Sequence, residues 1–169
     1  MTISLKVEEL SSVQEHLEGL ADLLVQVVEE GASIGFLPPC PNEEAEEYWT
    51  TAIKADHIIL YIVKSENEVA GSVQLHLSTT QNGSHRAEIA KLLVHPKFRR
   101  MGLGRILIQT AEERAKAEGR TLLVLDTREG DPSNLLYTSM GYTEAGRIPN
   151  YARSADGNLH TTVYYYKNL

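Results

Sequence analysis

The sequence predicts a mixed α/β fold, in which one mostly antiparallel sheet of six to seven strands is flanked by about four helices. Three observations support this prediction. Short alternating or continuously apolar segments indicate strands, and longer segments with helical periodicity indicate helices. A strand–helix–strand unit over residues 87–126 indicates a parallel pair with a right-handed crossover. Hairpin-like segments before and after this unit indicate antiparallel neighbours.

The first half of the chain contains three predicted strands and two predicted helices. Residues 3–7 alternate between apolar and polar side chains, which is typical of a short strand. The apolar side chains that follow recur on one helical face until Gly31, which is expected to end the helix. The predicted elements are a strand at 3–7, helices at 13–30 and 42–54, and two strands within 57–78.

The second half supplies the remaining strands and helices. Residues 90–94 are apolar except for Lys91, and residues 121–126 form another apolar run, so both segments are expected to be strands covered on both faces. In the helix between them, Glu112 and Lys116 are expected to form an exposed pair. The predicted elements are strands at 85–94, 121–126, 142–148 and 160–167, and helices at 103–118 and 132–140.

Length and composition restrict the class of protein. A chain of 169 residues is expected to form a single domain, residues 1–169. A net charge of −7 argues against nucleic acid as a partner. We find no signal peptide and no apolar run of about 20 residues, and a single cysteine, Cys40, so a cytoplasmic protein without membrane contact is expected. A monomer and a homodimer are both compatible with the sequence.

The segment from Arg99 to Gly104 is a candidate anion-binding loop. Its spacing is R-x-x-G-x-G, and it lies between a predicted strand and a predicted helix. The first amides of a helix lack backbone partners and attract anions, and glycines permit a close approach of the ligand. The segment lacks the Gly-Lys-Ser/Thr of a Walker loop and the third glycine of a dinucleotide-binding loop. Its arginines could instead be ordinary solvated charges.

Two segments together resemble the GCN5-related N-acetyltransferase (GNAT) superfamily. The segment "KLLVHPKFRRMGLGRILIQTAEERAKAEG" resembles the strand, pyrophosphate loop and helix of that family, and "NLLYTSMGY" resembles its second signature. Four further segments, "GASIGF", "HRAEIAKLLV", "LLVLDTREG" and "ARSADGNLHTTVYYYK", resemble the tabtoxin-resistance acetyltransferases. This second resemblance covers about residues 31–167. Asn150 departs from the pattern, because a glycine is expected there.

The resemblance implies a GNAT fold with acetyl-CoA as co-substrate. No spacing of His, Cys and Asp residues resembles a metal site, so no metal is expected. Backbone amides of the loop would hold the pyrophosphate, and the end of the strand at 92–94 would pair with the pantetheine amides. The implied CoA-binding residues are Leu92, Leu93, Val94, Arg99, Arg100, Met101, Gly102, Leu103, Gly104, Arg105, Asn134 and Tyr137.

Acetyl transfer to an amine requires a neutral nucleophile, because an alkyl ammonium with a pKa near ~10.4 is almost fully protonated at neutral pH. The resemblance implies that Glu88 and Asp126 bind and deprotonate the amine, and that Tyr137 protonates the departing thiolate. Either carboxylate could be the base. Each residue also has a structural alternative: Glu88 as a solvent-facing strand residue, Asp126 as a strand-end cap, and Tyr137 as a core aromatic.

The acceptor itself is not determined by these motifs. We expect a small-molecule primary amine, with detoxification of a toxin or an antibiotic as one form of the activity. A peptide N-terminus or a lysine is the first alternative. A non-catalytic acyl-CoA-binding module is the second.

Overall fold

The computed structural model of the protein describes residues 3–169, whose elements follow the predicted order. The first strand lies two to three residues later than predicted, and the strand predicted at 142–148 continues to residue 153, through residues expected to form a loop. The other elements lie close to their expected positions. The strands are β1 (Leu5–Leu10), β2 (Ile58–Ser65), β3 (Glu68–Leu77), β4 (Arg86–Val94), β5 (Leu122–Arg128), β6 (Thr143–Arg153) and β7 (Leu159–Asn168). The helices are α1 (Leu17–Glu29), α2 (Asn42–Ala52), α3 (Leu103–Ala117) and α4 (Ser133–Ser139).

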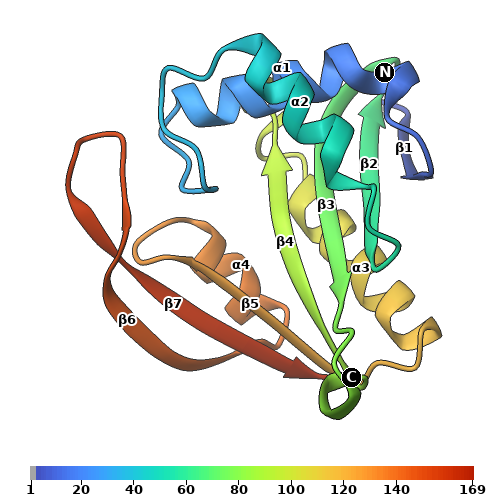
Figure 1. Cartoon of the computed structure of the whole chain (residues 1–169), viewed down its shortest axis with the longest axis vertical. Coiled ribbons are helices and arrows are strands. Elements are labelled where there is room, and N and C mark those ends of the chain that lie inside the picture. Colours follow the sequence, from blue (N-terminus) through green and yellow to red (C-terminus); the bar gives the residue numbers. More distant parts are fainter. Residues whose placement is uncertain (1–2) are drawn as a thin grey trace.

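The strands form one seven-stranded sheet in the order β1-β2-β3-β4-β5-β7-β6. β4 and β5 are parallel, and all other neighbouring strands are antiparallel. This confirms the predicted fold class, including the parallel pair around α3. Figure 1 shows the β6–β7 hairpin extending to one side of the layers formed by the remaining elements.

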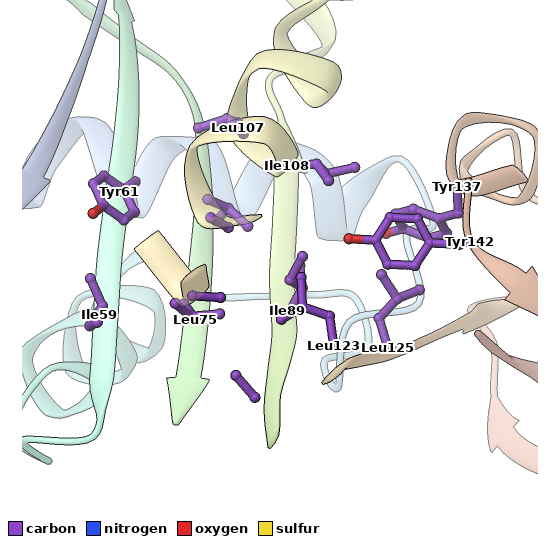
Figure 2. Packing of buried hydrophobic residues seen from close by; sticks show 14 of the residues in the cluster. Ile59, Tyr61, Leu75, Ile89, Leu107, Ile108, Leu123, Leu125, Tyr137 and Tyr142 are labelled. Carbon is purple, nitrogen blue, oxygen red and sulfur yellow. The ribbon is translucent and has the colours of Figure 1, made fainter. Parts of the chain in front are cut away.

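Two apolar clusters cover opposite faces of the sheet. Alternate side chains of β2, β3, β4 and β5 pack with α3, and Figure 2 shows Tyr137 and Tyr142 beside Leu125 at one end of this cluster. The other face of β2 packs with α1 and α2 around the fully buried Trp49. The two-residue period of each strand therefore decides which side chains face α3 and which face α1 and α2.

The parallel pair is short, and its strands then separate. Only residues 86–88 of β4 pair with residues 122–124 of β5. Beyond these residues the two strands diverge, leaving an opening in the sheet that widens towards their carboxyl ends (Figure 1). We refer to this divergence of β4 and β5 as the strand opening.

A β-bulge lies in β4 beside the strand opening. Ala90 pairs with Gln74 of β3, and Leu93 pairs with Ser72, so two residues of β4 face one residue of β3. One of the two, Lys91, has a φ of +50°, in the left-handed region. Ile89 and Leu93 are four residues apart and would share a face in a regular strand. Because of the extra residue, Ile89 packs with the α3 cluster while Leu93 packs with the α1–α2 cluster.

Three expectations about burial are wrong. Residues 90–94 and 121–126 are not covered on both faces; Lys91, Val124 and Asp126 are only partly buried. Glu112 is buried, not exposed, and binds the Tyr142 hydroxyl and Lys167 instead of Lys116. The burial of these residues depends on whether another element covers them, and the local sequence pattern does not contain that information.

Candidate active site

The loop before α3 presents a row of backbone amides without backbone partners. The first hydrogen bond of α3 runs from the Ile106 amide to the Gly102 carbonyl at 3.2 Å. Within residues 3–169, the amides of 100–105 donate to no backbone acceptor. Arg100 and Gly102 have φ values of +61° and +76°, and such turns orient successive amides toward one side. The loop and the helix N-terminus together fit a phosphate group.

The two glycines of this loop have different structural roles. Gly102 caps α3 in the left-handed conformation, and a Cβ there would meet no atom within 4 Å. A Cβ at Gly104 would lie 3.1 Å from the Leu136 side chain of α4. Gly102 therefore provides the turn, while Gly104 permits close packing of α3 against α4.

Two arginines of the loop already have protein partners. Arg99 forms a 2.6 Å salt bridge with Glu30 at the end of α1, and its Nε also donates to the Val94 carbonyl. Arg105 donates to Ser139 Oγ at 2.7 Å. Arg100 is exposed and has no side-chain hydrogen bond to another described residue. The loop is therefore held by side chains, while its amides are left for a ligand.

The carboxyl-terminal part of β4 forms one wall of the strand opening. Leu93 and Val94 pair with Ser72 and Gly71 of β3 on one side. On the other side, β5 no longer pairs with β4 after Glu88. The Val94 carbonyl accepts from Arg99 Nε, and the other polar backbone groups at this edge are available to an extended ligand that adds to the sheet.

Two carboxylates lie on one face of the sheet where the strands separate. Glu88 pairs with His76 of β3. Its neighbours Ala87 and Ile89 face α3, so the Glu88 side chain lies on the opposite face of the sheet. Asp126 lies two residues beyond Val124, the β5 partner of Glu88, and so shares this face. Glu88 is accessible to solvent, yet the surrounding protein raises its pKa by desolvation, and the Asp126 charge raises that pKa further. A carboxylate with a raised pKa is better matched to proton abstraction near neutral pH.

Asp126 is fixed by a neighbouring strand. Thr162 of β7 donates a 2.7 Å hydrogen bond from Oγ1 to the Asp126 carboxylate. Tyr164, the β7 partner of Asp126, shares its face and hydrogen-bonds the Tyr151 hydroxyl at 3.0 Å. This surface is therefore rich in polar groups, in contrast to the α3 face.

Tyr137 of α4 is buried in the cluster on the α3 face of the sheet, opposite the face that carries Glu88 and Asp126. Its ring centroid lies 5.8 Å from those of Tyr142 and Tyr165. Within the described part of the chain, its hydroxyl has no hydrogen-bond partner. Burial raises the pKa of Tyr137, and the Asp126 charge contributes to the increase, so the hydroxyl keeps its proton throughout the neutral range. A protonated hydroxyl without a protein partner can donate to a ligand.

Asn134 is engaged with the protein. Its amide nitrogen donates to the carbonyls of Arg128 and Asp131, both at 2.9 Å, and its side-chain oxygen accepts from the Tyr165 hydroxyl at 2.8 Å. The observed contacts give it the role of fixing the loop between β5 and α4, which carries Tyr137.

The match to a protein family is consistent with the strand opening and the amide-lined loop. Residues 19–142 match the model of the acetyltransferase (GNAT) family. The chain belongs to the GNAT family. It is an acetyl-CoA-dependent N-acetyltransferase.

Individual relatives give the same result. The GNAT chain is 33% identical over 115 residues to an uncharacterized N-acetyltransferase of Azospirillum brasilense, covering 67% of this chain and 68% of the relative. It is 29% identical over 99 residues to the ribosomal protein bS18-alanine N-acetyltransferase of Escherichia coli K12, covering 52% and 67%. The structure of yncA from Salmonella typhimurium, solved with its cofactor acetyl-CoA, superimposes with a TM-score of 0.80 at 16% identity, covering 98% and 94%.

The GNAT structure brings most of the predicted site residues to the strand opening. The strand end 92–94 and both carboxylates lie on β4 and β5 where these strands separate. The loop 99–105 and the start of α3 contact α4, the helix that carries Tyr137. Leu103 is buried and contributes packing through its side chain, so only its amide faces the loop ligand. Residues 3–169 contain no cluster of His, Cys, Asp and Glu arranged for a metal ion. None of the described helices has the length and apolar character that a bilayer crossing requires.

Three further residues, which the sequence motifs did not indicate, lie beside the two carboxylates. Thr162, Tyr164 and Lys91 share the polar surface with them. Alternation within "HTTVYYYK" could have placed Thr162 and Tyr164 on one face, because they are two residues apart. No local signal marks Lys91, whose position depends on the bulge.

Proposed function

We propose that this enzyme transfers the acetyl group of acetyl-CoA directly to the primary amine of a small molecule in the strand opening. The observation that carries the proposal is the shared face of Glu88 and Asp126 at the point where β4 and β5 separate. Two carboxylates there would attract an ammonium group and accept its proton. Tyr137 on the other side would donate a proton to the thiolate that departs.

The residues present fit acetyl-CoA, which supplies the acetyl group as an activated thioester. The amides of 100–105 would bind its pyrophosphate, and the free edge of β4 at Leu92–Val94 would pair with its pantetheine amides. Glu88 would act as the general base, because its carboxylate is accessible and its pKa is raised. Asp126, held by Thr162, would bind the ammonium and tune the pKa of Glu88.

We also propose that the enzyme is a close relative of the tabtoxin-resistance acetyltransferases. The four segments that resemble that branch support this placement. Asn150, which replaces the expected glycine, has a φ of +55°, a conformation that glycine favours and asparagine tolerates, so this difference in sequence is compatible with the same backbone. A detoxifying activity on an amine-bearing toxin or antibiotic would follow. Residues 1–169 would then form a single catalytic domain.

A protein N-terminus is the second candidate acceptor. The observation that favours it is the similarity to the bS18-alanine N-acetyltransferase of Escherichia coli, an enzyme named for a ribosomal-protein alanine. The hairpin of β6 and β7 and the loop from residue 30 to 41 flank the acceptor side and would decide between a compact amine and a peptide.

The test is the release of free CoA from acetyl-CoA with a panel of acceptors. The panel would contain amino acids, polyamines, amine-bearing antibiotics and peptides that begin with alanine. Turnover with small amines and none with the peptides would support the proposal, while the reverse would favour the protein acceptor. Calorimetric binding of acetyl-CoA without CoA release on any acceptor would contradict both and favour a non-catalytic module.

A further inference from the structure

Lys91 places an ammonium group beside the two carboxylates of the strand opening. It belongs to the β4 bulge, three residues after Glu88. Its Nζ lies 3.7 Å from the position that a Cβ of Gly35 would occupy, and 5.9 Å from the centroid of the Tyr48 ring. The side chain therefore extends toward the loop between α1 and α2, on the acceptor side of the sheet.

The ammonium group of Lys91 has no salt-bridge partner among residues 3–169. Lys64, Lys97 and Lys167, by contrast, each contact a carboxylate at 2.7–3.1 Å. Glu88 and Asp126 act on Lys91 only at longer range; their charges raise its pKa while burial lowers it more strongly. A half-buried cation without a direct counter-ion is costly unless a ligand supplies the negative charge.

The polar neighbours of Lys91 are occupied with one another. Gln74 Nε2 donates to the Tyr48 hydroxyl at 2.8 Å, and Gln74 Oε1 lies 2.8 Å from His76 Nε2. This chain of hydrogen bonds leaves Lys91 only the face of the Tyr48 ring, a weak interaction at this distance. Within residues 3–169 the ammonium group of Lys91 therefore keeps its hydrogen-bond donors free for a ligand.

A hollow of about 240 Å³ lies between the α1–α2 loop and the β6–β7 loop, and Gly35, which Lys91 Nζ approaches, is one of its lining residues. Lys91, Glu88 and Asp126 are not among its lining residues. Gly35 and Phe36 line one side of it, and residues 152–155 line the other. Small-molecule pockets commonly measure about 300–1,000 Å³, so this hollow suits a compact group better than a long chain.

We propose that Lys91 binds a negatively charged group, most simply a carboxylate, on the acceptor whose amine is bound by Glu88 and Asp126. This inference rests on the proposed function and adds a substrate class to it: small molecules that carry an amine and an acid group close together. Such an acceptor would supply both missing counter-charges, a cation for the carboxylates and an anion for Lys91. The role of Lys91 would be to select the acceptor, not to transfer a proton.

The test compares matched acceptors with and without a carboxylate. L-alanine and L-2,4-diaminobutyrate would each be paired with their amides in the CoA-release assay, using the wild type, Lys91→Gln and Lys91→Arg. Lys116→Gln, an exposed change on α3, is the control variant. Thermal unfolding and acetyl-CoA binding show that each variant is folded.

We expect the wild type to favour the acids over the amides by about tenfold or more in kcat/KM, as a charge-assisted hydrogen bond would produce. Lys91→Gln is expected to abolish this preference through KM. Lys91→Arg should retain part of it. Because the Lys91 charge lowers the pKa of Glu88, the variants are compared at a pH above that pKa, where activity on the amides and the KM for acetyl-CoA should stay unchanged. An equal loss on acids and amides, or a loss confined to kcat, would overturn the inference and indicate a structural or proton-transfer role.

The outcomes separate this inference from the proposed function. If the wild type acetylates no small amine, the proposed function fails, and binding of the same acids and amides to CoA-saturated protein is measured by calorimetry. Weaker binding of the acids alone by Lys91→Gln would still support the inference. Equal affinities, or no binding of the acids by the wild type, would contradict it.

Discussion

Thr162 donates a 2.7 Å hydrogen bond from Oγ1 to the carboxylate of Asp126, and the same hydroxyl approaches the Thr127 carbonyl at 3.1 Å. Glu88, on the same face, has no such partner among the described side chains. The two carboxylates therefore differ: Asp126 is fixed by β7, while Glu88 is accessible to solvent. This difference supports separate roles in the proposed reaction.

The pH dependence of kcat/KM should report the carboxylate of Glu88. A base acts when deprotonated, so activity should rise with pH through the raised pKa of Glu88 and level off above it. Asp126→Asn removes a charge that raises this pKa, so the rise should move to lower pH. Glu88→Gln should lower the plateau by about 10²–10⁴-fold, as typical for loss of a general base. A rise that stays in place in Asp126→Asn would contradict the coupling.

Tyr137→Phe should lower kcat by about 10²-fold or more at all pH values below the raised pKa of Tyr137, without changing the KM for acetyl-CoA. Stability should change by less than about 1 kcal/mol, because no described residue hydrogen-bonds its hydroxyl. Tyr142→Phe is the matched control. It removes a 2.9 Å hydrogen bond to buried Glu112 and should cost about 1–3 kcal/mol of stability while preserving kcat. CoA release measures kcat, and chemical denaturation measures the stability of the two variants. An unchanged kcat in Tyr137→Phe would exclude Tyr137 as the acid.

Gly102→Ala should weaken acetyl-CoA binding. The φ of +76° costs a residue with a Cβ about 1–2 kcal/mol, and relaxation of this strain would turn the amides of 100–105 away from a common centre. Gly119→Ala has nearly the same φ, +73°, at the end of α3, and a Cβ at either position meets no atom within 4 Å. Both variants should lose similar stability, but only Gly102→Ala should raise the Kd for acetyl-CoA in calorimetry. Equal Kd values in the two variants would refute a role of these amides.

Glu30→Gln should strengthen acetyl-CoA binding slightly. It releases Arg99 from its salt bridge, and the free guanidinium can turn toward a phosphate. Because exposed pairs contribute about 0–1 kcal/mol, a two- to fivefold lower Kd at low salt is expected, with a smaller effect at high salt. Glu68→Gln, which breaks the exposed Lys97 pair, serves as the control and should leave Kd unchanged. Tighter binding in both variants would indicate a general charge effect.

The order of elements was predictable from periodicity and turn residues. The segment 85–126 shows this most clearly, since its strand–helix–strand pattern required a parallel pair and the structure contains it. The loop 99–105 was predictable as a turn into a helix, because its glycines are adjacent in sequence. Its role as an anion site stays a prediction.

Features that depend on distant elements were not predictable. The partly buried Val124 was expected to be fully buried, because its sequence neighbours are apolar and only the tertiary structure shows that its face is open. Glu112 was expected at the surface, but Tyr142 and Lys167, 30 and 55 residues away, enclose it. The sequence did not indicate that Thr162 and Lys91 lie beside the two carboxylates, because their positions arise from strand pairing and from the bulge.

The bulge at Lys91 also determines which change of length β4 can accept. Counted from Ile89 on the α3 side, simple alternation without Lys91 would place Leu92 and Val94 on the α3 side and Leu93 on the α1–α2 side, which are the sides they already occupy. The fully buried Leu93 would keep its place in the cluster around Trp49. A deletion of Lys91 would therefore remove the bulge and its ammonium group together and leave the end of the strand oriented as before. Related chains are therefore expected to tolerate the loss of one residue at this position of β4.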